Sequence, residues 1–207
     1  MNNFNFASYS DFMKSHSFWD NFKSDAEYCL TIQTDGCLCK NSLYNIQDFF
    51  KYDYVGGYGI SSGYYWRHTH YLHNSDAYQC FNGGFSLRNI AISRKVLDFF
   101  PPKPTESWRG KKQIHEYPED LYYICGMLKL KMNVAIDKYG TNFCTHTTYI
   151  SNTFCVHDYL GVCKNRESFL KCRKNRELEL FLKYCPEYKN FLKVENDLED
   201  VYPPLIL

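Results

Sequence analysis

The chain has 207 residues, which is enough for one domain with a full hydrophobic core. Its 24 Lys and Arg nearly balance its 23 Asp and Glu, which argues against a nucleic-acid binder that relies on a broad positive field. The sequence shows neither an apolar run of about 18 residues nor a secretory signal, so we expect a cytoplasmic protein without a membrane span and with its 10 cysteines reduced.

The first half of the chain predicts one helix, two short strands and a long loop. Ser10 followed by Asp11 indicates a helix start, and Phe12, Trp19 and Phe22 then fall on one helical face. Residues 28–34 form an apolar-rich run typical of a buried strand, which stops at the turn pair Asp35-Gly36. The remaining expectations are a helical turn at 46–51, a strand at 52–55 ended by Gly56-Gly57, and an irregular loop at 56–80.

The second half alternates strands with clearer helices. The expected strands are 85–88, 133–137 and 153–157, and the expected helices are 90–100, one that opens at Pro118, and a helical segment at 164–200 broken near Pro186. In the Pro118 helix, Glu119 and Asp120 occupy the first turn, where the helix dipole favours acids. This alternation predicts a single α/β domain over residues 1–207 with a mixed, mainly parallel sheet.

Two segments, one after a predicted strand and one before the predicted strand at 85–88, carry candidate ligand-binding residues. Asp35 follows a buried strand, and a carboxylate at the carboxyl end of a strand can hold a divalent cation that bridges diphosphate oxygens. An ordinary turn is the competing interpretation. Asn82 suits sugar hydroxyls because its amide both donates and accepts, and Gly83 and Gly84 let the backbone approach a ligand, although a Gly-Gly turn without a ligand explains the pattern equally well.

Three further sets of residues are candidates for a chemical role. One carboxylate of the pair Glu119-Asp120 can accept a proton from an acceptor hydroxyl, unless both acids only cap the helix. His157, at the end of a predicted strand, is a candidate metal ligand or a structural histidine. A zinc module is the remaining alternative; it would use Cys37 and Cys39 with His68, His70 and His73, although their spacing departs from the usual zinc pattern.

The order of these segments resembles a family of GT-A glycosyltransferase-like domains found in giant DNA viruses, fungi and other eukaryotes. The match covers roughly residues 18–190, and an A/T-rich codon bias would explain the many Asn, Lys, Tyr and Phe in keeping with a giant-virus source. The matching segments are Ile32-Gln33-Thr34-Asp35-Gly36, Tyr52-Asp53-Tyr54-Val55-Gly56-Gly57, Asn82 to Arg88, Glu119-Asp120, Phe154-Cys155-Val156-His157 and Cys185-Pro186-Glu187.

The resemblance implies a role for each matching position. Asp35 would be the remaining acid of the Asp-x-Asp motif that binds Mn²⁺ (or Mg²⁺) and the donor diphosphate, and His157 would be a further metal ligand. Asp120 would be the catalytic base and Glu119 a hydrogen-bond partner of the substrate. The substrate would contact Asn82, Gly83, Gly84, Gly57 and Arg88. Many members of the family that the chain resembles have a Lys after the histidine, whereas this chain has Asp158.

These roles imply an inverting transfer of a hexose from a nucleotide-sugar, expected to be a UDP-sugar, to a glycan or protein hydroxyl. The loop at 57–78 would close over the donor. Only about 30 residues precede Asp35, whereas a GT-A domain places a βαβ unit for the nucleobase there, so we expect the first βαβ unit to be short or missing. The chain is then either a fragment, or a protein whose base pocket a partner or a homodimer contact completes. The alternative function is a truncated, non-catalytic relative that acts in binding or assembly.

Overall fold

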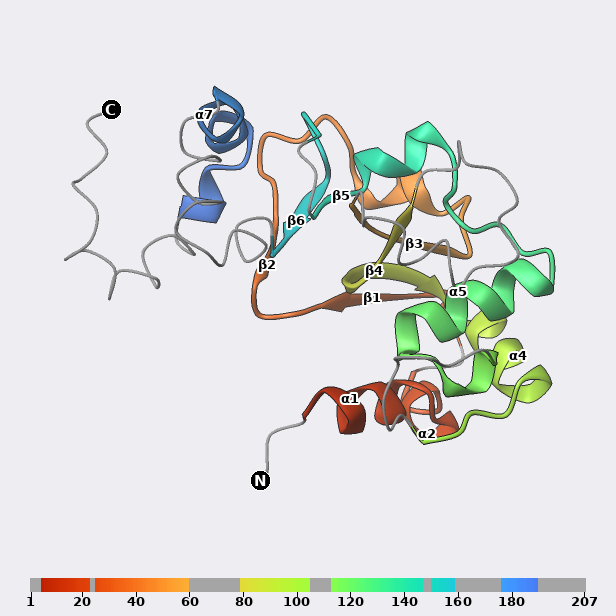
Figure 1. The fold of residues 1–207 in the computed structure, drawn as a ribbon. Coiled ribbons are helices and arrows are strands. Elements are labelled where there is room, and N and C mark those ends of the chain that lie inside the picture. Colours follow the sequence, from red (N-terminus) through yellow and green to blue (C-terminus); the bar gives the residue numbers. More distant parts are fainter. Residues whose placement is uncertain are drawn as a thin grey trace.

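A computed structural model describes residues 5–22, 25–59, 79–104, 113–146, 150–158 and 176–189. The described part is a mixed α/β fold in which a six-stranded sheet is flanked by helices (Figure 1). The strands are β1 (Tyr28–Ile32), β2 (Gly36–Leu38), β3 (Tyr54–Tyr58), β4 (Cys80–Asn89), β5 (Cys144–Thr145) and β6 (Cys155–His157). The α-helices are α1 (Phe6–Met13), α2 (His16–Trp19), α4 (Ile90–Phe99), α5 (Glu119–Lys129) and α7 (Arg176–Tyr184). Short 3₁₀ helices are η1 (Ile46–Phe49), η2 (Ile114–Glu116), η3 (Lys138–Asn142) and η5 (Pro186–Tyr188).

The sheet has the strand order β1-β4-β3-β5-β6-β2. Only the β3–β5 and β5–β6 pairs are parallel, and the other three pairs are antiparallel, so the expected α/β class is confirmed but a mainly parallel sheet is wrong. The expected strand at 133–137 is also wrong. Val134 forms a single bridge to Tyr54 there, and no further ladder follows because the chain turns into η3.

Two glycine pairs that resemble turns lie inside strands. Gly56 and Gly57 belong to β3, and Gly83 and Gly84 belong to β4, which runs ten residues and is buried along nearly its whole length. Glycine within a strand often marks a close approach by a neighbouring group. Side chains do approach Gly83 and Gly84 closely, as described for the site below. The predicted ends at these glycines are therefore wrong, although both strands exist.

The helices follow the local signals except in the first one, which starts earlier than predicted and is divided, so that Phe12 lies in α1, Trp19 in α2 and Phe22 after both. The first helix begins at Phe6 and not at Ser10, because the side chain of Asn5 accepts a hydrogen bond from Ser8 N and caps the first turn. Ser10 lies inside α1, where its hydroxyl accepts from the backbone N–H of Glu119 at 2.9 Å. Helix α4 and the break of the C-terminal helix before Pro186 are confirmed, and α5 begins directly after Pro118. Residues 164–175 and 190–200 of the predicted helical segment, and residues 60–78 of the predicted loop, lie outside the described residues.

Two hydrophobic layers form the core on the two faces of the sheet. One layer joins α2, α4 and α5 to the sheet and includes Trp19, Phe81 and Tyr123, all without exposed surface. The other joins η1, η3 and the sheet and includes Phe49, Phe85 and Phe143. β4 contributes to both layers, since Phe81 belongs to the first and Cys80, Phe85 and Leu87 belong to the second. Among the described residues, no helix is both long and apolar enough to cross a membrane.

The two edges of the sheet are joined by a short corner at residues 33–35. β1 and β2 stand at opposite ends of the strand order, yet only Gln33, Thr34 and Asp35 separate them in the chain. Gln33 N donates to Gly84 O at 2.8 Å, and Asp158 N donates to Asp35 O at 3.2 Å. The corner thus brings the middle of β4 next to the end of β6.

One pair of cysteines departs from the expectation of reduced thiols. Cys39, just after β2, forms a disulfide with Cys185, which lies between α7 and η5. The other cysteines among the described residues are free, and Cys37 Sγ lies 4.0 Å from Cys185 Sγ. The disulfide ties α7 and η5 to the β2 edge of the sheet, beside a small apolar cluster that includes Val156 and Phe181.

Candidate functional site

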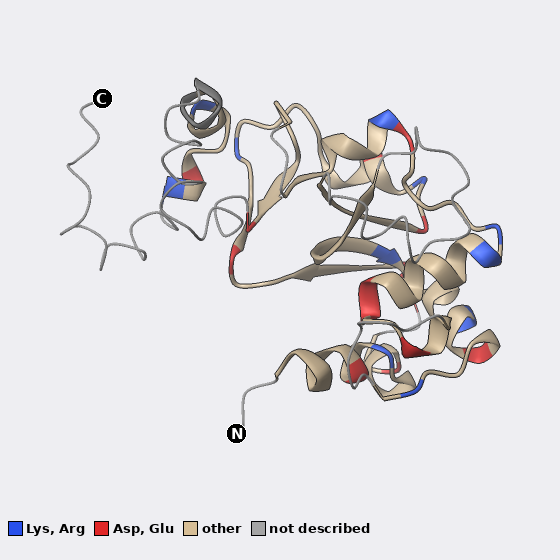
Figure 2. Ribbon diagram, in the orientation of Figure 1, with Lys and Arg blue, Asp and Glu red and all other residues tan. Residues whose placement is uncertain are grey.

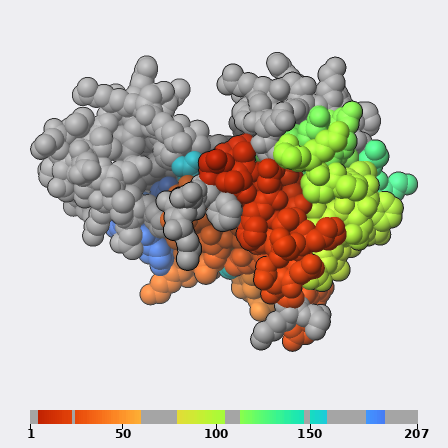
Figure 3. Space-filling view, turned by 90° about the horizontal axis from the view of Figure 1, so that it is seen from below, coloured from red at the N-terminus to blue at the C-terminus, as the bar shows by residue number. Residues whose placement is uncertain are grey.

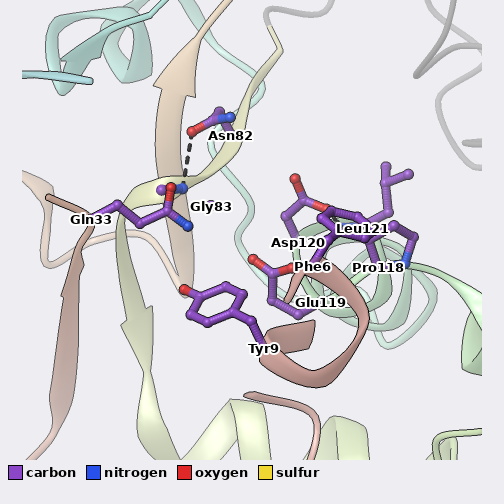
Figure 4. Close-up of a pocket in the computed structure, with 10 residues that line it drawn as sticks. Phe6, Tyr9, Gln33, Asn82, Gly83, Pro118, Glu119, Asp120 and Leu121 are labelled. Atoms are coloured by element: carbon purple, nitrogen blue, oxygen red, sulfur yellow. Dashed lines mark hydrogen bonds between the residues drawn. The ribbon is translucent and has the colours of Figure 1, made fainter. Parts of the chain in front are cut away.

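A cavity of about 400 Å³ lies where β4, α5, α1 and the corner after β1 meet (Figure 4). It is lined by Phe6, Tyr9, Gln33, Asn82, Gly83, Gly84, Pro118, Glu119, Asp120 and Leu121. Two of the predicted site segments, Asn82-Gly83-Gly84 and Glu119-Asp120, therefore supply its wall, whereas neither Asp35 nor His157 lines it. Figure 2 shows the acidic first turn of α5 facing the sheet, whereas acidic and basic residues elsewhere in the described chain are interspersed.

The missing side chain of Gly83 allows the acid pair to pack against β4. A Cβ atom at this position would lie 2.6 Å from Oε1 of Glu119, 2.8 Å from Nη2 of Arg88 and 3.1 Å from Cβ of Asp120. Contacts below 3.0 Å require a displacement, so any larger residue would displace the ends of the Glu119 and Arg88 side chains. Gly83 therefore leaves the space that the Glu119 carboxylate and the Arg88 guanidinium occupy beside β4.

Glu119 is fixed by a buried ion pair beneath the cavity. Nη2 of Arg88 lies 3.5 Å from Oε1 of Glu119, and the Arg88 guanidinium also donates from Nε to Ser86 Oγ at 3.0 Å. Arg88 is fully buried and packs over the rings of Tyr54 and Tyr123. This burial places Arg88 behind the cavity wall, which favours a supporting role over the predicted contact with a substrate.

Asp120 has the electrostatics of a general base that works near neutral pH. Its side chain is partly buried and lines the cavity, and Oδ1 accepts from Leu121 N at 2.7 Å. Burial and the charge of neighbouring Glu119 raise the pKa of Asp120 to about 7, against the opposing effects of the Leu121 hydrogen bond and Arg88. Carboxylates with a pKa raised by these two causes are common at catalytic sites.

Asp35 and His157 meet on the other side of the glycine pair. Nε2 of His157 lies 3.1 Å from Oδ1 of Asp35 and 3.1 Å from Oε1 of Gln33. Burial lowers the pKa of His157, although the nearby Asp35 carboxylate acts in the opposite direction. The lowered pKa favours a neutral imidazole. The ring of His146 stacks on that of His157, with 5.2 Å between centroids, and His146 Nδ1 bonds to the carbonyl of His157 at 3.0 Å.

Gly84 leaves the space that the His157 ring occupies. A Cβ atom on Gly84 would lie 2.2 Å from both Cε1 and Nε2 of His157 and 2.6 Å from Oε1 of Gln33. The two glycines thus stand back to back, with Gly83 against the acid pair and Gly84 against the histidine. This is how β4 brings the acid pair and the Asp35–His157 pair to two sides of one short segment.

The remaining predicted residues fall in different places. Asn82 lines the cavity, and its Oδ1 accepts from Gly84 N at 3.0 Å, drawn as the dashed line in Figure 4. Gly57 is buried in β3, paired with Asn82 on one side and with Cys144 on the other, and it does not line the cavity. Tyr9 and Gln33 line the cavity but are absent from the predicted set. The Tyr9 hydroxyl points toward Gln33 in Figure 4.

No pattern in the sequence marks Tyr9, whereas Gln33 lies two residues before Asp35 and its position could have signalled a role.

The alternative zinc module loses support. Cys39 is bonded to Cys185, and the three histidines proposed for it lie outside the described residues. Within the described ranges, no group of three or more His, Cys, Asp or Glu side chains is arranged to hold a metal ion.

A second hollow, which we call the β1 groove, adjoins the cavity. It has a volume of about 940 Å³ and shares Phe6, Tyr9 and Gln33 with the cavity. Its walls come from α1 and α2, which lie beside α4 on the face seen in Figure 3, and from β1 and its corner. The full lining is Asn5, Phe6, Tyr9, Phe12, Met13, Phe18, Phe22, Cys29, Leu30, Thr31, Ile32, Gln33, Thr34 and Asp35.

The fold and the site together define an α/β protein with a six-stranded mixed sheet and a cavity lined by two carboxylates, one of which has a raised pKa. The chain belongs to the DUF5672 family of proteins of unknown function, whose model matches residues 2–159. The matched segment includes every residue of the cavity and of the Asp35–His157 pair. No curated protein and no solved structure gives a significant match to the chain.

Proposed function

We propose that the chain is a metal-dependent glycosyltransferase of GT-A type that moves a hexose from a nucleotide-sugar to a hydroxyl acceptor with inversion. One observation carries the proposal. Gly83 and Gly84 hold a carboxylate with a raised pKa on one side and a carboxylate–imidazole pair on the other, at a cavity of about 400 Å³. A base and a site for a charged leaving group are the two parts that such a transfer requires.

Asp120 is the residue suited to accept the proton of the acceptor hydroxyl. As the acceptor oxygen bonds to the anomeric carbon, its proton passes to the Asp120 carboxylate. The bond from the anomeric carbon to the phosphate oxygen breaks, and its electron pair leaves with the nucleoside diphosphate. A pKa of about 7 makes Asp120 a stronger base than an ordinary carboxylate while leaving a large ionised fraction near neutral pH.

Asp35, Gln33 and His157 form a donor set that fits a divalent cation. The carboxylate and amide oxygens suit Mg²⁺ or Mn²⁺, and a neutral imidazole suits Mn²⁺. Nε2 of His157 lies 3.1 Å from an oxygen of each of the other two residues, so the three donors face one another closely. When bound, the cation would neutralise charge on the leaving diphosphate. The third donor is an amide, which explains why no group of three acids, histidines or cysteines is found among the described residues.

The polar side chains in the cavity wall suit a sugar. The side chain of Asn82 and the carboxylate of Glu119 can bond to hydroxyl groups, and the glycine pair permits a ring to lie close to the backbone of β4. The ion pair between Arg88 and Glu119 holds that carboxylate in place. Asn82 and Glu119 therefore orient the hexose in this mechanism, and Arg88 supports Glu119 from behind.

The test combines the protein with Mn²⁺ and a panel of UDP- and GDP-sugars. We expect one donor to raise the thermal midpoint and to be slowly hydrolysed in a Mn²⁺-dependent manner, because water replaces the missing acceptor. The same donor should bind the Asp120→Asn variant but show little hydrolysis. If no donor shifts the midpoint and none is hydrolysed, the proposal fails.

A non-catalytic sugar-binding protein is the second candidate. Its support is that the described residues offer only two strong metal ligands, Asp35 and His157, with an amide as the third donor. Such a protein would bind a free glycan in the cavity equally well with Mn²⁺ and with EDTA, and Asp120→Asn would leave its binding unchanged. A strict Mn²⁺ requirement would exclude it.

A further inference from the structure

The β1 groove leads directly to the Asp35 side of the site. It ends at Asp35, and it is separated from the cavity by Phe6, Tyr9 and Gln33, which line both hollows. A ligand that reaches from the groove past Asp35 into the cavity would therefore pass the donor set before it reaches Asp120. The groove needs an explanation of its own, because the mechanism above uses only its Asp35 end.

One wall of the groove is the unpaired edge of a strand. Gln33 N donates to Gly84 O, and in an antiparallel pair the residues that bond to the partner alternate with residues whose backbone groups point away. Thr31 and Cys29 thus bond toward β4, whereas the N–H and C=O of Leu30 and Ile32 point outward. β1 is at the edge of the sheet formed by the described residues, and Leu30 and Ile32 both line the groove.

The opposite wall is aromatic. The rings of Phe12 and Phe18 lie 5.3 Å apart in an edge-to-face arrangement, and Phe18 contacts Phe22 at 5.4 Å in the same way. Phe6 and Phe12 retain 58% and 37% of their surface exposed, so they offer ring faces to a ligand without first leaving the core. The groove therefore combines flat apolar surfaces with a peptide edge that both donates and accepts hydrogen bonds.

We propose that the β1 groove binds the nucleoside of the donor, with the base against the aromatic wall and its polar edge on the backbone of Leu30 and Ile32. The inference rests on the proposed function. A nucleobase has two apolar faces and an edge that carries donors and acceptors, which matches the two walls. The spatial order also matches the donor. The β1 groove comes first, then the Asp35–His157 pair and then the cavity, just as the base, the diphosphate and the sugar follow one another in the donor.

The sharpest test changes one backbone N–H. Ile32→Pro removes an outward N–H that makes no bond within the sheet, and edge strands accept proline at such positions. Ile32→Ala removes only the side chain and keeps the N–H. We expect UDP with Mn²⁺, measured by titration calorimetry, to bind Ile32→Ala within about twofold of the unchanged protein and Ile32→Pro at least tenfold more weakly. Circular dichroism of both variants checks that the fold is intact.

A second pair of variants tests the aromatic wall. Phe12→Ala should weaken UDP binding at least fivefold, whereas Phe99→Ala, at an exposed phenylalanine of α4 outside both hollows, should leave it unchanged. If UDP binds and both Ile32→Pro and Phe12→Ala retain full affinity, the base lies elsewhere and the inference is overturned, while the proposed transfer can still stand.

Photocrosslinking locates the base without any substitution. Irradiation of the protein with 5-iodo-UDP and Mn²⁺, followed by peptide mapping, should label residues 5–22 or 28–35. Labelling confined to other segments contradicts the inference. Binding of extended peptides in the groove, without binding of UDP, also contradicts it. If neither UDP nor any other nucleoside diphosphate binds, the inference and the proposed function fail together.

Discussion

Nε2 of His157 lies 3.1 Å from Oδ1 of Asp35, although the two residues are far apart in the chain. The corner between β1 and β2 creates this contact, because it carries the chain from pairing with β4 to pairing with β6 in three residues. His157 is almost fully buried whereas Asp35 is about half exposed, so the pair joins the protein interior to the solvent at this point.

Asp35→Ala should remove metal binding without harming the fold. The side chain is 49% exposed, so its loss should change the free energy of unfolding by only about 0.5 kcal/mol. Affinity for Mn²⁺, followed by electron paramagnetic resonance, should fall at least ~10-fold because one strong ligand is gone. Asp98→Ala, an exposed acid of α4, is the control. Equal Mn²⁺ affinity of the two variants would remove Asp35 from the metal site.

Gly84→Ala should displace the His157 ring. The new Cβ would lie 2.2 Å from Nε2, so we expect a loss of about 1–3 kcal/mol of stability and at least ~10-fold weaker Mn²⁺ binding. Gly126→Ala is a matched control, since its Cβ would lie 2.5 Å from Val96 in the core between α4 and α5. That variant should lose stability but keep Mn²⁺ binding. Normal binding by Gly84→Ala would show that His157 is not a ligand.

Asp120→Asn should abolish transfer and change how stability depends on pH. The pKa of Asp120 lies near 7 in the folded protein against 3.8 for an ordinary aspartate, so the folded state holds the proton more tightly. The free energy of unfolding therefore falls as the pH rises from about 4 to about 7. An asparagine does not titrate, so at pH 8 the variant should be more stable than the unchanged protein by about 1 kcal/mol or more.

The measurement is chemical denaturation of both proteins at pH 5 and pH 8, together with initial rates of sugar transfer. The stability difference in favour of Asp120→Asn should be larger at pH 8 than at pH 5. The rate should fall on the order of 100-fold or more, as loss of a general base predicts. A difference that does not change with pH would mean that Asp120 is an ordinary carboxylate, which is a weaker base than the mechanism assumes.

Removal of the Cys39–Cys185 disulfide should loosen the C-terminal elements first. The bond closes a long loop, with a sequence separation of 146, so Cys39→Ser should cost about 2–5 kcal/mol. Limited proteolysis should then cut near α7 and η5 before the rest of the chain. Cys37→Ser leaves the bond in place and serves as the control. If dithiothreitol and Cys39→Ser leave the thermal midpoint unchanged, the bond does not contribute to stability.

Local sequence signals predicted the elements whose cause is local. The strand at 28–34 and the helices at 90–100 and after Pro118 follow from apolar patterning and first-turn residues, and all three are present. The strand ends at Gly57 and Gly83 were misplaced because a glycine inside a strand resembles a turn in sequence. These glycines are instead explained by a side chain from a distant part of the chain, such as Glu119 or His157, that packs against them. No local sequence pattern contains that contact.

The candidate site was predicted unevenly for the same reason. Asp35, Asn82, Asp120 and His157 were chosen from their positions beside strands and helix starts, and the fold gathers them around one short segment of β4. Tyr9 carries no such mark, and Gln33 was not chosen although it lies two residues before Asp35. They matter only because the corner and α1 place them between the two hollows, which depends on the pairing of distant strands.

The corner at residues 33–35 has a consequence for how the molecule responds to a ligand. Its backbone is bonded to β4 through Gln33 and to the residue after β6 through Asp35, while its side chains belong to the donor set. A cation held there would restrain both margins of the sheet at once. Amide hydrogen exchange should therefore slow in both β1 and β6 when Mn²⁺ is added, even though three other strands separate them in the sheet. The magnitude of that slowing would report occupancy of the metal site without any assay of catalysis.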